Sequence, residues 1–204
     1  MSGNGNIIIV SAPSGAGKTS LVRELIARDP AARKSISYTT RPRRPSETEG
    51  IDYHFVDAGT FRKMLEDGEF LESAEVHGNM YGTGHQWIRE QRMLGFDIVL
   101  EIDWQGAKQV RALMPEAVGI FVLPPSVRSL RGRLTKRAQD TEAVIAARLA
   151  AARSEVAHVH EFDYVIINDV FDDAVEDLVS IVRSTRLRLA TQLDRNQDLI
   201  NSLK

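Results

Sequence analysis

A glycine-rich segment near the N-terminus has the residue types and the spacing of a phosphate-binding loop. Residues 12–19 read APSGAGKT and match the pattern G-x-x-x-x-G-K-[ST], except that Ala12 replaces the first glycine. Glycines allow successive backbone N–H groups to surround phosphate oxygens. In this pattern the lysine, here Lys18, reaches the β- and γ-phosphates of a nucleotide, and the hydroxyl of Thr19 holds Mg²⁺. The sequence therefore predicts a nucleotide site with a magnesium ion.

The segments on either side of the loop favour this interpretation over a glycine-rich turn with a chance lysine. The apolar run from Ile7 to Val10 is typical of a strand that is buried on both faces. From Lys18 to Arg28 apolar residues recur at helical spacing, and Pro30 lies where that helix should stop. The loop would thus open a helix, whose N-terminus favours negative charge.

A basic segment farther along the chain suits the phosphate group of a second ligand. In the stretch SYTTRPRR, residues 37–44, Arg41, Arg43 and Arg44 lie around Pro42, which restricts the backbone. An arginine fork can grip a phosphate dianion through two hydrogen bonds. Taken alone, these residues describe a solvated basic loop equally well.

Two more segments place polar side chains where a ligand could reach them. In FLESAEVHGNMYGT, residues 70–83, two glycines bracket Tyr81. In LEIDWQG, residues 100–106, Glu101 and Asp103 end an apolar strand. Carboxylates at the C-terminal end of such a strand lie beside the ligand crevice of an open α/β sheet.

Composition narrows the class of protein. The 204 residues are 43% hydrophobic and 26% charged, which is typical of a globular protein with one domain, with or without inserted lobes. The formal net charge of -2 gives no overall attraction to nucleic acid or to anionic membranes. The absence of cysteine excludes disulfides, thiolate catalysis and zinc–thiolate sites. We expect a cytoplasmic protein without a membrane partner, because no stretch is apolar enough to span a bilayer.

The remaining apolar segments predict an α/β fold with a parallel sheet. Strands are expected at residues 97–102, 118–123 and 164–167, and helices at 106–113, 127–137, 141–158 and from Phe171 through Leu189. Strands that alternate with helices favour a parallel sheet covered on both sides. Residues 37–95 break this rhythm and read as short strands, among them 51–56 and 70–76. Residues 128–148 carry six basic and two acidic side chains and read as a separate helical segment.

Together these motifs resemble those of the guanylate kinases, which make GDP from GMP and ATP. The resemblance rests on APSGAGKTS, SYTTRPRR with Tyr53 downstream, FLE-x-A-x-V-x-G-N-x-Y-G-T, L-x-IDWQG, RL-x-x-R with Gln139 and Asp140, and VIIND. The motifs stand in the family's order over about residues 6–190. In such enzymes the loop usually begins Ala-Pro-Ser-Gly, which accounts for Ala12.

The resemblance implies a P-loop core with a parallel sheet flanked by helices, an inserted GMP-binding lobe and a helical lid. The core would comprise residues 1–36, 96–126 and 155–204, the lobe residues 37–95, and the lid residues 127–154. Lobe and lid are expected to close over the nucleotides. A homo-oligomer is compatible with the long amphipathic helix expected near the C-terminus.

The resemblance also assigns residues to the two substrates. The ATP site would comprise Ala12, Pro13, Ser14, Gly15, Ala16, Gly17, Lys18, Thr19 and Ser20, with Asn168 near adenine; a helix cap is an equally good interpretation of Asn168. The phosphate of GMP would contact Arg41, Arg44, Tyr53 and Tyr81. Guanine would contact Ser37, Glu72, Thr83 and Asp103. A carboxylate accepts from both guanine N1–H and N2–H₂, whereas adenine offers neither donor at those positions.

Catalysis in such enzymes is positioning and charge neutralisation rather than covalent chemistry. Lys18 and Mg²⁺ would neutralise the β- and γ-oxygens, with Thr19 as a ligand of the ion and Glu101 acting weakly, through water. Arg133, Arg137 and Arg148 would close over the transferring group.

Two other functional classes remain to be separated from this one. The first is a guanylate-kinase-like module that binds peptides and has lost catalysis, but such modules typically degrade the loop and the lid arginines, which are present here. The second is a P-loop kinase with another acceptor, such as a sugar phosphate; Ser37, Glu72, Thr83 and Asp103 together favour guanine.

Overall fold

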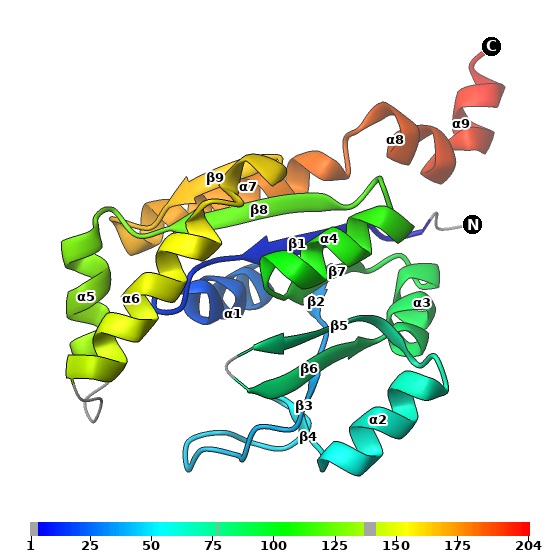
Figure 1. Cartoon of the computed structure of the whole chain (residues 1–204). Coiled ribbons are helices and arrows are strands. Elements are labelled where there is room, and N and C mark those ends of the chain that lie inside the picture. The colour runs from blue at the N-terminus through cyan, green and yellow to red at the C-terminus, as the bar shows by residue number, and fades with distance from the viewer. Residues whose placement is uncertain (1–3, 77, 137–141) are drawn as a thin grey trace.

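The core of the molecule is a five-stranded parallel sheet with the strand order β2-β7-β1-β8-β9 (Figure 1). The computed structural model describes residues 4–76, 78–136 and 142–204, and it leaves out the side chains of residues 136–145. The strands are β1 (Ile7–Ser11), β2 (Ala32–Lys34), β7 (Asp97–Glu101), β8 (Val118–Leu123) and β9 (Tyr164–Ile167). The four strands of this sheet that the sequence predicts are confirmed within one residue, and β2 adds an edge.

Helices cover both faces of this sheet. Successive side chains of β1 point to opposite faces, so each face contributes to its own apolar cluster. Ile8 and Val10 pack into one apolar cluster with residues of α1 (Lys18–Arg28) and α7 (Phe171–Thr185). Ile7 and Ile9 pack into a second cluster with residues of α3 (His85–Met93) and α4 (Trp104–Leu113). The core strands therefore form a rigid layer, and their C-terminal ends point toward the phosphate loop and the helices α5 and α6 (Figure 1).

A second sheet lies beside the core and is built from residues 37–95. Its order is β4-β3-β6-β5, with β3 and β4 parallel and the other two pairings antiparallel. The strands are β3 (Tyr38–Thr39), β4 (His54–Phe55), β5 (Phe70–Val76) and β6 (Asn79–Gly84). The strand predicted at 70–76 is confirmed, whereas the one predicted at 51–56 shrinks to two residues.

This region also holds α2 (Ala58–Glu66) and α3, which the expectation of short strands missed. Asp57 caps α2, since its carboxylate accepts hydrogen bonds from the N–H groups of Gly59 and Thr60 at 2.8 and 2.9 Å. An aspartate before the helically spaced Phe61 and Leu65 is the signal that could have found α2.

Helices α5 (Val127–Lys136) and α6 (Glu142–Val156) form a hairpin at the C-terminal edge of the core sheet (Figure 1). Leu130 and Leu134 of α5 pack against Ala152 of α6 in a small apolar cluster. The short turn η1 (Val159–Glu161) then leads back to β9. The helices predicted in this region are confirmed in the described residues.

The prediction of one long helix from Phe171 through Leu189 is wrong at its C-terminal end. Helix α7 stops at Thr185, and α8 (Leu189–Arg195) and α9 (Gln197–Ser202) follow as separate short helices. The Arg186 side chain turns into the core to pair with Asp29 at 3.0 Å and with Asp97 at 2.5 Å. This tertiary contact fixes the chain direction just after α7 and outweighs the helical spacing of the leucines. Across the described ranges, no helix combines the length and the apolar character needed to cross a membrane.

Asp97 is a buried charge that holds the start of β7 to three other segments. It is 0% exposed and accepts hydrogen bonds from the Asn6 N–H at 2.8 Å, the Asn6 side chain at 2.9 Å and the Arg186 guanidinium. Arg195 lies 3.6 Å away. Removing one partner of such a buried pair leaves the other charge uncompensated.

We expect Asp97→Ala to lower the free energy of unfolding by about 3 kcal/mol, because it removes one of the two carboxylate partners of Arg186 and leaves two donors of Asn6 unpaired. Urea unfolding followed by circular dichroism measures this. Asp172→Ala, which removes an exposed partner of Arg28, is the control and should change the value by less than about 0.5 kcal/mol. Equal unfolding midpoints for the two variants would contradict the structural role of Asp97.

Candidate active site

The phosphate loop connects β1 to α1 and depends on two glycines. Gly15 and Gly17 have φ angles of +89° and +100°, a region that L side chains rarely adopt. A Cβ on Gly17 would lie 2.4 Å from the Asn168 side-chain nitrogen. The predicted loop thus has a backbone that only glycine at these two positions permits. Lys18 begins α1, and its ammonium donates to the carbonyl of Ile102 at 3.3 Å.

Oxygen ligands gather beside this loop where β7 ends. The Thr19 hydroxyl donates to one oxygen of Glu101, and the other oxygen lies 3.2 Å from the ammonium of Lys34. The described ranges hold no group of three or more acidic, histidine or cysteine side chains that could enclose a metal. One hydroxyl and one carboxylate fit Mg²⁺, which keeps several waters and takes its remaining ligands from substrate phosphates.

A largely buried hydrogen-bonded cluster lies on the second sheet, where the charge of Lys18 still reaches it. Glu72 of β5 is 4% exposed and accepts a hydrogen bond from the Thr83 hydroxyl of β6 at 2.5 Å, and Ser37 lies 3.1 Å from the same hydroxyl. Burial raises the pKa of Glu72 to about 7, against the hydrogen bond from Thr83, which lowers it. The negative charge of Asp103 also raises this pKa. The structure therefore brings together the residues predicted to contact guanine.

Asp103 serves a local purpose as well. Its carboxylate caps α4 by accepting from the Gly106 N–H at 2.9 Å, while Gln105 donates to its other oxygen at 3.1 Å. A Cβ on Gly106 would lie 2.4 Å from an oxygen of Glu72. The absence of a side chain at Gly106 is what lets the two carboxylates come close.

The residues predicted to hold the phosphate of GMP form a second group in the same lobe. Arg41 lies over the Tyr53 ring at 5.5 Å, and the Tyr53 and Tyr81 rings are 5.9 Å apart. Glu47 binds Arg41 through two hydrogen bonds of 3.0 and 2.7 Å and lies 3.6 Å from Arg44. The two arginines therefore meet at a carboxylate that the sequence did not single out, and the two tyrosines lie beside Arg41.

The structure describes two of the three arginines of residues 127–154 that were predicted to be catalytic. Arg133 of α5 reaches the loop, where it donates to the Ala16 carbonyl at 3.0 Å and to the Asn168 carbonyl at 2.7 Å. Arg148 lies half-buried on α6. Arg137 lies outside the described residues.

Asn168 contacts the phosphate loop directly. Its side-chain nitrogen donates to the Ala16 carbonyl at 2.7 Å, and the side chain is almost fully buried. It does not cap the helix that follows, since α7 begins after Val170 without a side-chain cap. Of the two interpretations of Asn168, the helix cap is wrong.

Comparison with known proteins identifies the family. The guanylate kinase family model matches residues 4–185. The guanylate kinase of Methylobacillus flagellatus is 55% identical over 199 residues, and that of Aromatoleum aromaticum is 54% identical over 200 residues; each alignment covers 98% of both chains. The chain belongs to the guanylate kinase family.

A solved structure supports the same conclusion at the level of the fold. The crystal structure of guanylate kinase from Anaplasma phagocytophilum aligns with a TM-score of 0.79 at 33% identity and covers 93% of this chain and 90% of its own. The expected fold class, a parallel sheet core flanked by helices, is confirmed. The expected activity, ATP:GMP phosphotransfer, is confirmed through the family.

Three residues near the guanylate kinase site were missed from the sequence. Glu47 lies between Arg41 and Arg44, and Lys34 pairs with Glu101. The Glu155 carboxylate of α6 faces the N–H of Ser14; burial raises its pKa, while Lys18 and that N–H lower it. No motif marks these side chains, because each gains its place only through contacts between distant segments.

We expect Gly106→Ala to raise the KM for GMP about tenfold, because the added methyl must displace the Glu72 carboxylate from the guanine pocket. The KM for ATP should change by less than about twofold, since Glu72 is assigned to guanine and not to ATP. Steady-state kinetics with each substrate varied separately measures both values. Gly132→Ala is the control, because a Cβ there meets nothing within 4 Å. An unchanged KM for GMP would contradict the placement of guanine beside Glu72.

Proposed function

We propose that the chain transfers the γ-phosphoryl group of ATP to GMP, and also to dGMP, in the cleft between the phosphate loop and the second sheet. The observation that carries this proposal is the hydrogen-bonded cluster of Glu72 and Thr83, both buried, with Ser37, beside which Asp103 lies. Such a cluster offers the acceptors that the N1–H and N2–H₂ groups of guanine require.

Binding of ATP is assigned to the loop and its surroundings. Backbone N–H groups of residues 14–20 surround the phosphates, and the N-terminus of α1 adds its positive dipole end. Asn168 and Arg133 both hold the Ala16 carbonyl, which keeps the loop in its phosphate-binding shape. Asn168 is therefore proposed to have two roles: it holds the phosphate loop in place, and it lies beside the adenine of ATP.

Binding of GMP is assigned to the lobe of residues 37–95. Its phosphate contacts Arg41, Arg44, Tyr53 and Tyr81. The phosphate replaces the Glu47 carboxylate as the partner of the two arginines. Glu72 in its ionised form accepts from guanine, with Ser37 and Thr83 beside it. Asp103 completes the guanine pocket from the end of β7.

Transfer needs in-line alignment of the two phosphates and neutralisation of their charge. Lys18 moves from the Ile102 carbonyl to the β- and γ-oxygens of ATP. Thr19, and Glu101 through water, would hold Mg²⁺, which supplies further positive charge to these oxygens. Arg133, Arg137 and Arg148 stabilise the charge that spreads over the transferring group. This reaction requires no covalent bond between the enzyme and the transferred phosphoryl group.

The division of the chain and its location belong to this proposal. Residues 1–36, 96–126 and 155–204 act as the core, residues 37–95 as the GMP lobe and residues 127–154 as the lid. Closure of lobe and lid excludes water, which would otherwise accept the phosphoryl group. The enzyme is proposed to work in the cytoplasm, where ATP and GMP are available.

A coupled assay of ADP formation with MgATP tests the function directly. The acceptors are GMP, dGMP, AMP, CMP and UMP, each at the same concentration. We expect turnover with GMP and dGMP and less than about 1% of that rate with the other three, because only guanine offers both N1–H and N2–H₂ to the buried carboxylate of Glu72. Turnover with a different acceptor would overturn the roles of Glu72 and Asp103. Binding of MgATP without any turnover would favour the catalytically silent binding module.

A further inference from the structure

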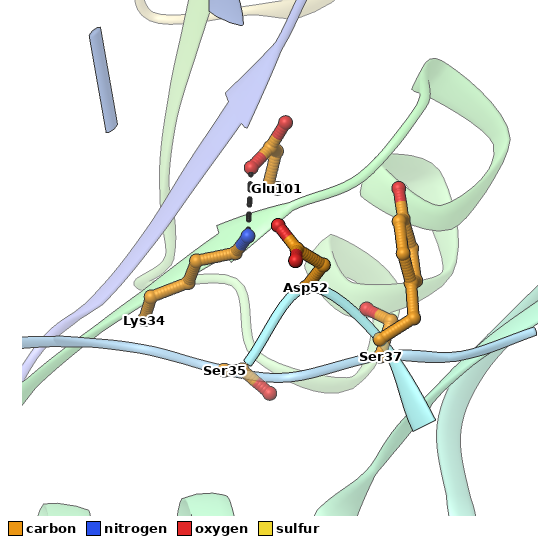
Figure 2. A pocket seen from close by; sticks show the side chains of 6 residues that line it. Lys34, Ser35, Ser37, Asp52 and Glu101 are labelled. Atoms are coloured by element: carbon orange, nitrogen blue, oxygen red, sulfur yellow. Dashed lines mark ion pairs between the residues drawn. The ribbon is translucent and has the colours of Figure 1, made fainter. Parts of the chain in front are cut away.

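Lys34 is a cation in the cleft that neither the motifs nor the proposed substrate contacts account for. It is the last residue of β2, the edge strand of the core sheet, and its neighbour on β7 is Val99. The C-terminal ends of parallel strands face the ligand crevice. Figure 2 shows its side chain directed at Glu101, with Ser37 and Asp52 close by.

Lys34 and Glu101 form an ion pair without a hydrogen bond between them. The ammonium lies 3.2 Å from one oxygen of Glu101, and that buried oxygen has no hydrogen-bond partner. The side chains are 24% and 9% exposed, respectively. The attraction between the ammonium of Lys34 and the carboxylate of Glu101 is therefore purely electrostatic. It is stronger here than at the surface, because little solvent screens it.

The same cavity contains residues proposed to bind GMP. Its walls include Ser37 and Tyr53 together with Lys34, Glu101 and Asp52. Burial and, next, the negative charge of Glu101 raise the pKa of Tyr53 to about 12. The negative charge of Glu101 would likewise repel a phosphate placed beside Tyr53.

We propose that Lys34 is a charge-balancing residue of the GMP site, whose ammonium offsets the Glu101 carboxylate so that the phosphate of GMP can bind beside Tyr53. The inference rests on the proposed placement of GMP. The need for such a cation follows from the local charges, because the carboxylates of Glu101 and Asp52 both line the cavity that Tyr53 also lines. Lys34 acts through Glu101 and is a positioning residue, not a catalytic one.

Equilibrium binding of GMP and of guanosine, measured by calorimetry without ATP or Mg²⁺, tests this inference. Lys34→Met should weaken GMP binding about tenfold, because the carboxylate of Glu101 then repels the phosphate. Its affinity for guanosine should stay within about twofold, since guanosine carries no phosphate. Lys34→Arg keeps the charge and should bind GMP within about twofold of the original chain. A purely structural role for Lys34 would weaken both ligands equally, and that result would overturn the proposal.

The double variant Lys34→Met/Glu101→Gln separates the two ways in which a lysine could help. If Lys34 acts by offsetting Glu101, GMP affinity returns to within about twofold of that of Glu101→Gln alone. If the double variant stays as weak as Lys34→Met, Lys34 contacts the phosphate itself and the proposal is wrong. Lys63→Met is the matched control, because Lys63 pairs with Asp67 on the exposed face of α2. Failure of the unaltered chain to bind or phosphorylate GMP would instead overturn the proposed function.

Discussion

Lys18→Met is expected to lower kcat for GMP phosphorylation about 10³-fold while the chain stays folded. The lysine is the one side chain of the loop that can place a positive charge on the β- and γ-oxygens, and charge neutralisation supplies most of the catalysis in phosphoryl transfer. Methionine keeps the length of the side chain and removes only the charge. The deficit should therefore appear in kcat, with KM for GMP within about threefold.

The structure explains why this variant should fold. The Lys18 ammonium makes one hydrogen bond in the described structure, to the Ile102 carbonyl at 3.3 Å. Helix α1 is held by Leu21, Val22 and Leu25, which are fully buried. Single-turnover kinetics and a thermal melt measure the two parts of the prediction, with Lys108→Met on the exposed side of α4 as control. A kcat within tenfold of the original would contradict the role of Lys18.

Glu72→Gln is expected to lower kcat/KM for GMP about 10³-fold and to leave MgATP binding unchanged within twofold. The amide has nearly the same shape as the carboxylate, but it cannot accept from both N1–H and N2–H₂ of guanine. Thr83 and Ser37 keep their places, because the side-chain oxygen of glutamine still accepts from the Thr83 hydroxyl. Glu75→Gln, on the exposed face of the same strand, is the control. Retained selectivity for GMP over AMP would show that another group reads the base.

The pKa of Glu72 adds a pH dependence to this prediction. The unfolded chain releases this proton near pH 4.5, whereas burial raises the pKa in the folded chain to about 7. The folded chain therefore holds the proton across that window, and the contribution of Glu72 to stability falls as pH rises from 4.5 to 7. Guanine needs the ionised form, so the affinity for guanosine should rise over the upper part of this range and level off above pH 7. In Glu72→Gln the affinity should be low and flat, and a flat profile in the original chain would contradict the assignment.

Local patterns predicted the elements that a run of residue types marks within one stretch of chain. The strands at 7–10 and 118–123 could be predicted because strands buried on both faces need continuous apolar residues. The strand at 164–167 carries a similar apolar run, although it lies at the edge of the sheet and is mostly exposed. Helix α1 could be predicted because the phosphate loop fixes its start and Pro30 follows its end. The end of α7 was not, because Arg186 turns toward Asp29 and Asp97, which belong to segments far away in the sequence. Helix α2 was missed although Asp57 marks its beginning.

The sequence by itself determined the family, the P-loop fold class and the kinds of residue in each motif, since these depend on residue type and order along one stretch of chain. Only the tertiary structure decided which side chains meet. It brings Glu72 next to Thr83 and within reach of Gly106, puts Glu47 between two arginines, and sets Lys34 against Glu101. Such contacts join residues from different strands and helices, so their distances and the resulting pKa shifts follow from packing, which no local pattern encodes.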